Sequence, residues 1–196
     1  RIVVNNSEYN TGRFSVGTTG GDPDRPEDNN QHLIYGGDDP WTSYTTVRIG
    51  NQNWVFGNPT NRKAGRDGLY GEMLMPPTLE DGAIKAAWLL GPIEVTQILS
   101  FARSSTTGLM DTARIEYQVH NLDTVSHMVG LRIMVDTMLG SNDGAPFRVN
   151  EQALLSDTVF YANAMPEFWQ AFDSLSDPRV MSQGTLRGRG VTTPDR

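Results

Sequence analysis

Polar and apolar residues alternate along much of the chain, and this period of two is the pattern of β-strands with one buried face. The clearest examples are residues 93–101, 115–120 and 129–136. Turn-forming residues separate such segments, as at Gly91-Pro92. The pattern predicts long strands of an antiparallel sheet that packs against the core on one side only.

Shorter strand-like segments precede this region, and Gly, Pro or Asn residues separate most of them. They are residues 14–16, 43–49, 54–56, 69–75 and 83–90. Strand-like segments do not alternate with helix-like ones, which argues against a parallel α/β fold. We therefore predict an all-β protein, an antiparallel β-sandwich that forms a single domain over residues 1–196.

Two local predictions concern the later part of the chain. Residues 121–126 have the composition of a hairpin turn. A hairpin symmetric about them places Glu116 near Arg132 on one face, where opposite charges stabilise a sheet by roughly 0.2–1 kcal/mol. At most one short helix is expected, near residues 166–175, because Pro166 precedes two phenylalanines spaced four residues apart.

The composition of the chain argues against several classes of partner and of functional site. The chain has 16 Lys and Arg residues and 23 Asp and Glu residues, which gives a net charge of −7. An acidic chain argues against a nucleic-acid partner, which normally meets a basic face. The absence of cysteine excludes a disulfide scaffold, a cysteine-ligated zinc site and a cysteine nucleophile. No apolar run approaches the ~20 residues that span a bilayer, so no membrane span is predicted.

The first residue is Arg1, and a strand-like Ile-Val-Val follows it directly. The last residues, 191–196, do not resemble the end of a helix or strand. We therefore expect the chain to be a fragment of a longer protein. The sequence makes no prediction about the oligomeric state.

Aromatic residues suggest a carbohydrate site. Trp41, Tyr44 and Trp54 fall in a region rich in Thr, Asn and Gly. Aromatic faces among hydrogen-bonding side chains match the apolar face and the hydroxyl groups of a sugar. Tryptophan also fills β-sandwich cores, and that interpretation is favoured. With the polar residues of the later strands, the candidate ligand-binding set is Trp41, Tyr44, Trp54, Glu116, His120 and Arg132.

A second candidate site lies after the predicted strand 129–136. Asp136, Asn142 and Asp143 supply two carboxylates and an amide oxygen, and Ca²⁺ takes oxygen ligands from such loops. The spacing differs from that of an EF-hand, and Asn-Asp-Gly is also typical of a polar turn, which is the favoured interpretation. Ca²⁺ is the one candidate cofactor.

The histidines offer candidate acid–base chemistry. His120 and His127 flank the predicted hairpin, and either one beside a carboxylate in a cleft forms a general acid–base pair. Surface histidines without a chemical role are the favoured alternative. The common motifs of serine hydrolases, zinc proteases, dinucleotide-binding domains and phosphate loops are absent from the sequence.

Three segments, residues 14–23, 40–49 and 129–147, resemble a family of uncharacterised bacterial β-sandwich proteins. That family is similar in fold to the galactose mutarotase-like, or supersandwich, group of carbohydrate-active proteins. The resemblance implies a supersandwich architecture. It carries over no catalytic residue, because the glutamate and histidine motifs of mutarotases have no counterpart in this chain.

The leading hypothesis is a non-catalytic module that binds carbohydrate or another cell-envelope component on a secreted or cell-surface bacterial protein. A first alternative is a sugar-processing enzyme, an aldose epimerase-like protein or a lyase- or hydrolase-associated domain, in which an acidic residue works with His120 or His127. A second alternative is a purely structural cell-surface domain.

Overall fold

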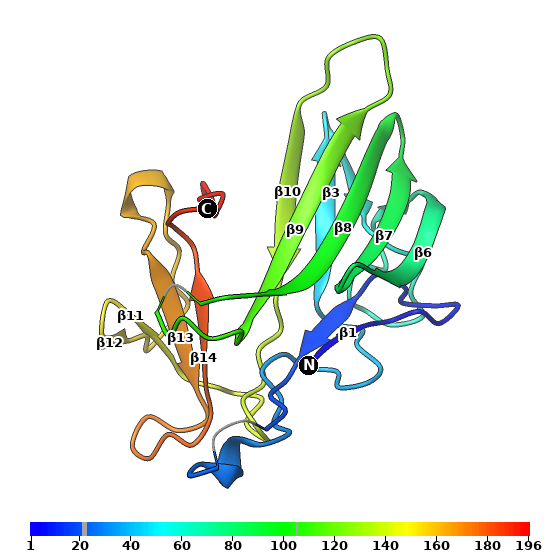
Figure 1. Ribbon diagram of the computed structural model, residues 1–196. Coiled ribbons are helices and arrows are strands. Elements are labelled where there is room, and N and C mark those ends of the chain that lie inside the picture. Colours follow the sequence, from blue (N-terminus) through cyan, green and yellow to red (C-terminus); the bar gives the residue numbers. More distant parts are fainter. Residues whose placement is uncertain (21–22, 105) are drawn as a thin grey trace. The chain divides into compact units, whose positions relative to one another are not determined.

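The computed structural model describes residues 1–20, 23–104 and 106–196, and nearly all of its regular structure is β-strand (Figure 1). This confirms the predicted all-β fold. Two short 3₁₀-helices, η1 (Pro26–Asp28) and η2 (Ala162–Ala164), are the helical elements of the described residues. No helix in this described part has the length and apolar character needed to cross a membrane.

The described strands, in chain order, are β1 (Ile2–Val4), β2 (Phe14–Val16), β3 (Tyr44–Ile49), β4 (Gln52–Val55), β5 (Leu69–Tyr70), β6 (Glu72–Glu80), β7 (Ala83–Leu90), β8 (Ile93–Ala102), β9 (Thr112–Asn121), β10 (Val129–Met134), β11 (Phe147–Val149), β12 (Gln152–Ala153), β13 (Phe168–Phe172) and β14 (Met181–Thr185).

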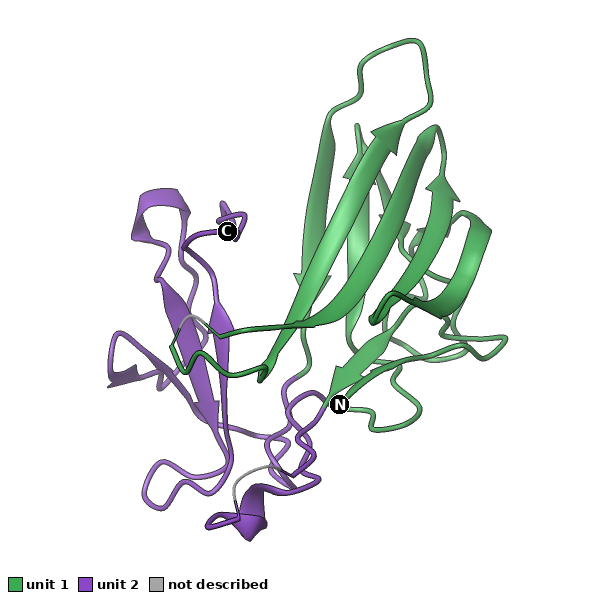
Figure 2. Cartoon of the chain, viewed as in Figure 1, with its two compact units in different colours: residues 1–16, 35–136 green, residues 17–34, 137–196 purple. Residues whose placement is uncertain are grey.

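The chain divides into two compact units (Figure 2). Unit 1 contains residues 1–16 and 35–136, and unit 2 contains residues 17–34 and 137–196. Each unit has its own cluster of buried apolar residues. The prediction of a single domain rests on continuous strand signals, and such signals do not mark where the chain passes from one unit to the other.

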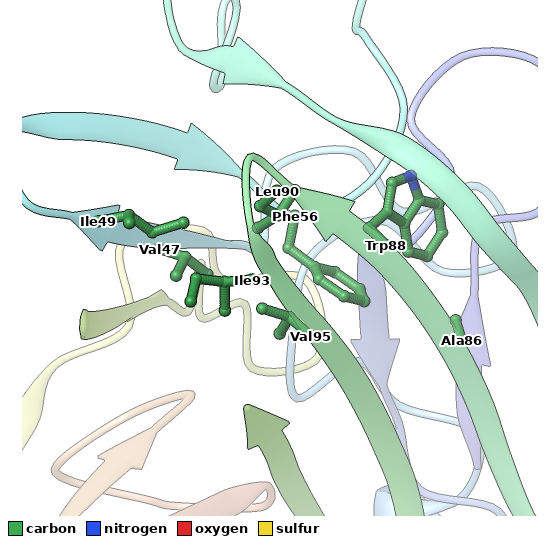
Figure 3. Packing of buried hydrophobic residues seen from close by; sticks show 8 residues of the cluster. All are labelled: Val47, Ile49, Phe56, Ala86, Trp88, Leu90, Ile93 and Val95. Atoms are coloured by element: carbon green, nitrogen blue, oxygen red, sulfur yellow. The ribbon is translucent and has the colours of Figure 1, made fainter. Parts of the chain in front are cut away.

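Unit 1 contains two four-stranded sheets, in the orders β10-β3-β4-β5 and β6-β7-β8-β9, and the two-stranded sheet β1-β2. Neighbouring strands are antiparallel, except that β4 and β5 pair in parallel over two residue pairs. Apolar side chains from both four-stranded sheets form one cluster (Figure 3). Its buried members are Val47, Ile49, Phe56, Ala86, Trp88, Leu90, Ile93 and Val95.

From Ile93 to Leu99, every second residue of β8 is buried, and these residues are the contribution of the strand to the interior of unit 1. Ile93, Val95, Gln97 and Leu99 are buried, whereas the residues between them are only half-buried. The strand pairs with β7 on one side and β9 on the other. The alternation predicted for residues 93–101 is therefore confirmed as far as Leu99, with one polar residue, Gln97, on the buried face, whereas Phe101 is exposed.

The predicted hairpin between residues 115–120 and 129–136 is wrong. β9 pairs with β8, whereas β10 pairs with β3 in the other sheet. Residues 122–128 carry the chain from one sheet to the other (Figure 1). Glu116 and Arg132 thus belong to different sheets and are not cross-strand partners. The sequence pattern misses this because alternation identifies a buried face but not the strand that pairs beside it.

A second difference concerns β6, which was expected to end before Pro76 and continues to Glu80. β6 is an edge strand, so a missing backbone N–H directed away from the sheet leaves no ladder bond unmade. Its register with β7 shifts between Met73 and Met75 and again between Met75 and Thr78. These irregularities let two consecutive prolines lie within the strand.

Unit 2 is built on the sheet β12-β11-β13-β14. Its buried cluster consists of Leu139, Ala145, Ala171 and Val180, with Leu33, Phe147 and Trp169 packed against it. The helix predicted near residues 166–175 is wrong, because Phe168–Phe172 is strand β13 and pairs with both β11 and β14. A spacing of four residues suits one helix face, but it also places both phenylalanines on one side of a strand.

Candidate binding groove

An open groove of about 590 Å³ lies on unit 1, at the sheet β10-β3-β4-β5. The alternation of β3 places Val47 and Ile49 in the core, and Tyr44, Thr46 and Arg48 face the groove. The groove residues therefore lie on the side of β3 opposite to the core cluster. The same period of two thus assigns alternate residues of β3 to the core and to the groove.

Register brings polar residues of three strands together in the groove. Arg132 on β10 is paired with Thr46 on β3, and Gly130 is paired with Arg48. Across β3, Arg48 is paired with Asn53 of β4. Residues paired in this way share one face of the sheet, so their side chains line one surface. Gly130 has no side chain, which leaves the space beside Arg48 open on that side.

A loop between β4 and β5 forms another wall of the groove and contributes Lys63, Arg66 and Asp67. Gly65, within this loop, has a φ of +82° and lies close to the ring of Tyr44. A Cβ atom there would lie 3.4 Å from the Tyr44 ring, and the backbone conformation is one that glycine adopts readily. Tyr70 donates a hydrogen bond to the Gly65 carbonyl oxygen at 2.8 Å, which holds the loop against the sheet.

Arg13 anchors this loop from behind. Its side chain is fully buried and donates to the carbonyl oxygens of Asn58 and Ala64 at 3.1 and 3.3 Å. It also donates to the hydroxyl of Tyr70, and its guanidinium lies 5.9 Å from the ring centroid of Tyr44. Desolvation lowers the pKa of Arg13, and the two tyrosines partly oppose this change. An arginine remains charged even so, and its charge lies directly behind the groove.

The groove is strongly basic. Its lining includes four cationic side chains, those of Arg48, Lys63, Arg66 and Arg132, and one carboxylate, that of Asp67. Arg66 and Asp67 lie 3.7 Å apart, and both side chains are largely exposed. Arg48 uses its Nε atom to donate to the Gly50 carbonyl oxygen. The side chains of Lys63 and Arg132 have no hydrogen-bond or ion-pair partner among the described residues.

The structure brings two of the predicted ligand-binding residues, Tyr44 and Arg132, into this groove. Trp54 instead packs against the core cluster, on the face of β4 opposite to Asn53. Trp41 packs edge-on against Tyr35, with ring centroids 6.1 Å apart, and Arg62 lies over its ring. These two tryptophans are therefore engaged by other parts of unit 1.

Glu116 and His120 lie on β9, in the other four-stranded sheet. Glu116 pairs with Arg114 at 2.8 Å, and His120 Nδ1 lies 3.9 Å from Glu94 Oε2. His127 Nε2 lies 2.8 Å from Asp123 Oδ2, in the connection between β9 and β10. The hydrogen bond with His127 holds the pKa of Asp123 below its usual value. None of these groups is part of the groove lining in the described structure.

Of the predicted Ca²⁺ ligands, Asp136 and Asn142 take part in hydrogen bonds within the protein, and Asp143 is exposed. Asp136 belongs to unit 1, and its backbone N–H donates to Ser43 Oγ. Asn142 accepts a hydrogen bond from the Gly144 N–H at 2.9 Å and donates to the Asp173 carbonyl oxygen, within unit 2. No group of three or more His, Asp or Glu side chains in the described ranges is arranged to hold a metal ion. Ca²⁺ binding by Asp136, Asn142 and Asp143 stays a prediction.

Sequence reasoning missed most of the basic residues of the groove. A signal was present, because residues 62–66 carry three basic side chains in a chain of net charge −7. Arg48 and Arg132 are far apart in sequence, and only the pairing of β3 with β10 brings them to one surface. Comparison with protein-family models, with curated proteins and with solved structures gave no match to this chain. The geometry of the groove is therefore the basis for any functional proposal.

Proposed function

We propose that unit 1 is a non-catalytic module that binds a carbohydrate, or another component of the cell envelope, in the groove on the β10-β3-β4-β5 sheet. The observation that carries this proposal is the convergence of Tyr44, Thr46, Asn53 and Arg132 on one open surface. An aromatic ring beside hydroxyl, amide and guanidinium groups matches the mixture of apolar faces and hydroxyls on a sugar. A secreted or cell-surface protein is the natural setting for such a module.

The chemistry of the groove favours binding over catalysis. General acid–base catalysis needs two groups with matched pKa values beside the reacting atoms. The described lining contains no histidine, and its carboxylate, Asp67, is largely exposed and lies beside Arg66. The close His–carboxylate pair, His127 with Asp123, lies in the β9–β10 connection. Arginine, lysine, tyrosine and asparagine supply hydrogen bonds to a ligand and need no proton transfer.

A glycan array that includes neutral and acidic glycans tests this proposal. The 196-residue chain is expected to retain a limited set of glycans. Asn53→Ala, at an exposed position of β4, is expected to reduce that binding. Arg114→Gln is the matched control, because this exposed arginine lies in the other sheet. Failure to retain any glycan would contradict the proposal and favour a purely structural domain.

A further inference from the structure

We infer that the groove selects an anionic saccharide, whose carboxylate or sulfate groups are bound by Arg132, Lys63 and their cationic neighbours. This inference rests on the proposed function and names the class of ligand for the same site. The described lining contains four cationic side chains and one carboxylate. The whole chain has a net charge of −7, so this positive surface stands out against an acidic remainder.

The hydrogen-bond donors of the groove are largely uncommitted. Lys63 and Arg132 have no side-chain partner among the described residues, and Arg48 uses only its Nε atom in a contact with Gly50. The ion pair of Arg66 with Asp67 spans 3.7 Å between exposed groups, where such a pair stabilises weakly. Guanidinium groups bind carboxylate and sulfate oxygens through paired N–H donors, and such charge-assisted bonds are the stronger ones.

The buried positive charge of Arg13, behind the groove, also favours an anionic ligand. Arg13 is fully buried, and no Asp or Glu pairs with it in the described structure. Its Nε atom is buried and has no hydrogen-bond partner among these residues. A buried charge without a counter-ion is costly in a medium of low dielectric. An anion in the groove, on the far side of Tyr44 and Gly65, partly offsets that cost because the two charges attract.

The same surface fits a saccharide better than a nucleic acid. Proteins that bind single-stranded nucleic acids combine a positively charged groove with several aromatic rings on which successive bases stack. Tyr44 is the aromatic residue of the described groove lining, which offers one ring and not a series of platforms. Asn53 and Thr46 supply an amide and a hydroxyl beside it, and these groups pair with sugar hydroxyls. An acidic saccharide uses both the cations and these neutral groups.

Isothermal titration of the full chain tests this inference with four probes: an oligogalacturonate that carries carboxylates, a chondroitin sulfate oligosaccharide, a neutral cello-oligosaccharide, and oligo(dT). We expect at least one acidic saccharide to bind more tightly than the neutral one, and its Kd to rise with salt. The acidic probe that binds identifies the anionic group.

The variants are Arg132→Gln and Lys63→Gln, with Arg114→Gln on β9 as the control. Each groove variant is expected to raise the Kd for the acidic saccharide about tenfold, whereas the control leaves it unchanged. Thermal melts establish that every variant is folded. The groove substitutions remove exposed side chains, so their melting midpoints should match the wild type.

Three outcomes would overturn the inference. Equal binding of neutral and acidic saccharides would keep the proposed function and reject charge selection. Tighter binding of oligo(dT) than of any saccharide would make the groove a nucleic-acid site. Binding of no saccharide would reject both the inference and the proposed function, so the two failures are distinguishable.

Discussion

The hydroxyl of Tyr117 on β9 lies 2.5 Å from the Oγ1 atom of Thr45 on β3. The same hydroxyl accepts a hydrogen bond from Nε2 of Gln97 on β8 at 2.6 Å. Thr45 and Gln97 are both buried, so this contact joins the two four-stranded sheets of unit 1 in its interior. Because hydrogen bonds are directional, this polar contact fixes the packing of the two sheets more strictly than apolar contacts alone would.

Tyr117→Phe is expected to destabilise unit 1 by about 1–3 kcal/mol, because it leaves the Thr45 hydroxyl buried without its partner. Gln97 keeps one contact, with the Gly12 carbonyl oxygen at 3.3 Å. Urea denaturation of wild type and variant measures the change. Tyr9→Phe is the control, since Tyr9 is exposed and lies in the same unit. Equal effects of the two substitutions would show that the Tyr117 hydroxyl does not stabilise the fold.

For Tyr117 we also expect a loss of its stabilising contribution at alkaline pH. Burial raises the pKa of Tyr117 to about 12, and the hydrogen bonds with Thr45 and Gln97 oppose this only in part. The unfolded pKa is about 10, so the contribution is fully present below pH 10 and is lost as the pH rises through 12.

The two pKa values correspond to a contribution of about 3 kcal/mol. Urea midpoints measured between pH 9 and pH 12 should therefore fall more steeply for the wild type than for Tyr117→Phe. Parallel curves for the two proteins would contradict the raised pKa.

Gly184→Ala is expected to destabilise unit 2 by about 1–3 kcal/mol through overpacking. Gly184 is paired with Trp169 across β13 and β14, and an added Cβ atom would lie 2.2 Å from the indole ring. The ring is packed against the core of unit 2, so it has little space to move. Denaturation followed by tryptophan fluorescence measures the effect. Gly144→Ala is the control, because the nearest atom there is 3.6 Å away, and it should change stability much less.

Arg13→Met is expected to loosen the loop that carries Lys63 and Arg66. The substitution keeps much of the aliphatic volume but removes the donors that hold the carbonyl oxygens of Asn58 and Ala64. Trypsin should then cleave after Lys63 or Arg66 faster than in the wild type, because a released loop fits a protease more readily. Arg114→Met is the control, and circular dichroism checks that the β-structure is retained. Unchanged cleavage would show that the loop is held by other contacts.

The local pattern predicted strand structure correctly where one face of a segment is more deeply buried than the other. It identified residues 93–101 as a strand, and the buried positions of β8 follow it. It failed for residues 166–175, because phenylalanines four apart are on one face in a helix and also in a strand. The pairing of β13 with β11 and β14 decides between these two structures, and that pairing involves distant residues.

The sequence by itself determined that this protein is all-β, and it indicated which side of β8 is buried, because alternation is a property of consecutive residues. The apolar faces predicted for residues 115–120 and 129–136 include the exposed Val119, Leu131 and Ile133. Only the tertiary structure decided that β10 pairs with β3 and not with β9. Backbone hydrogen bonds are the same for every residue type except proline, so strand partners depend on how the whole core packs. That pairing places Arg132 beside Thr46, and with the loop held by Arg13 it creates the basic groove.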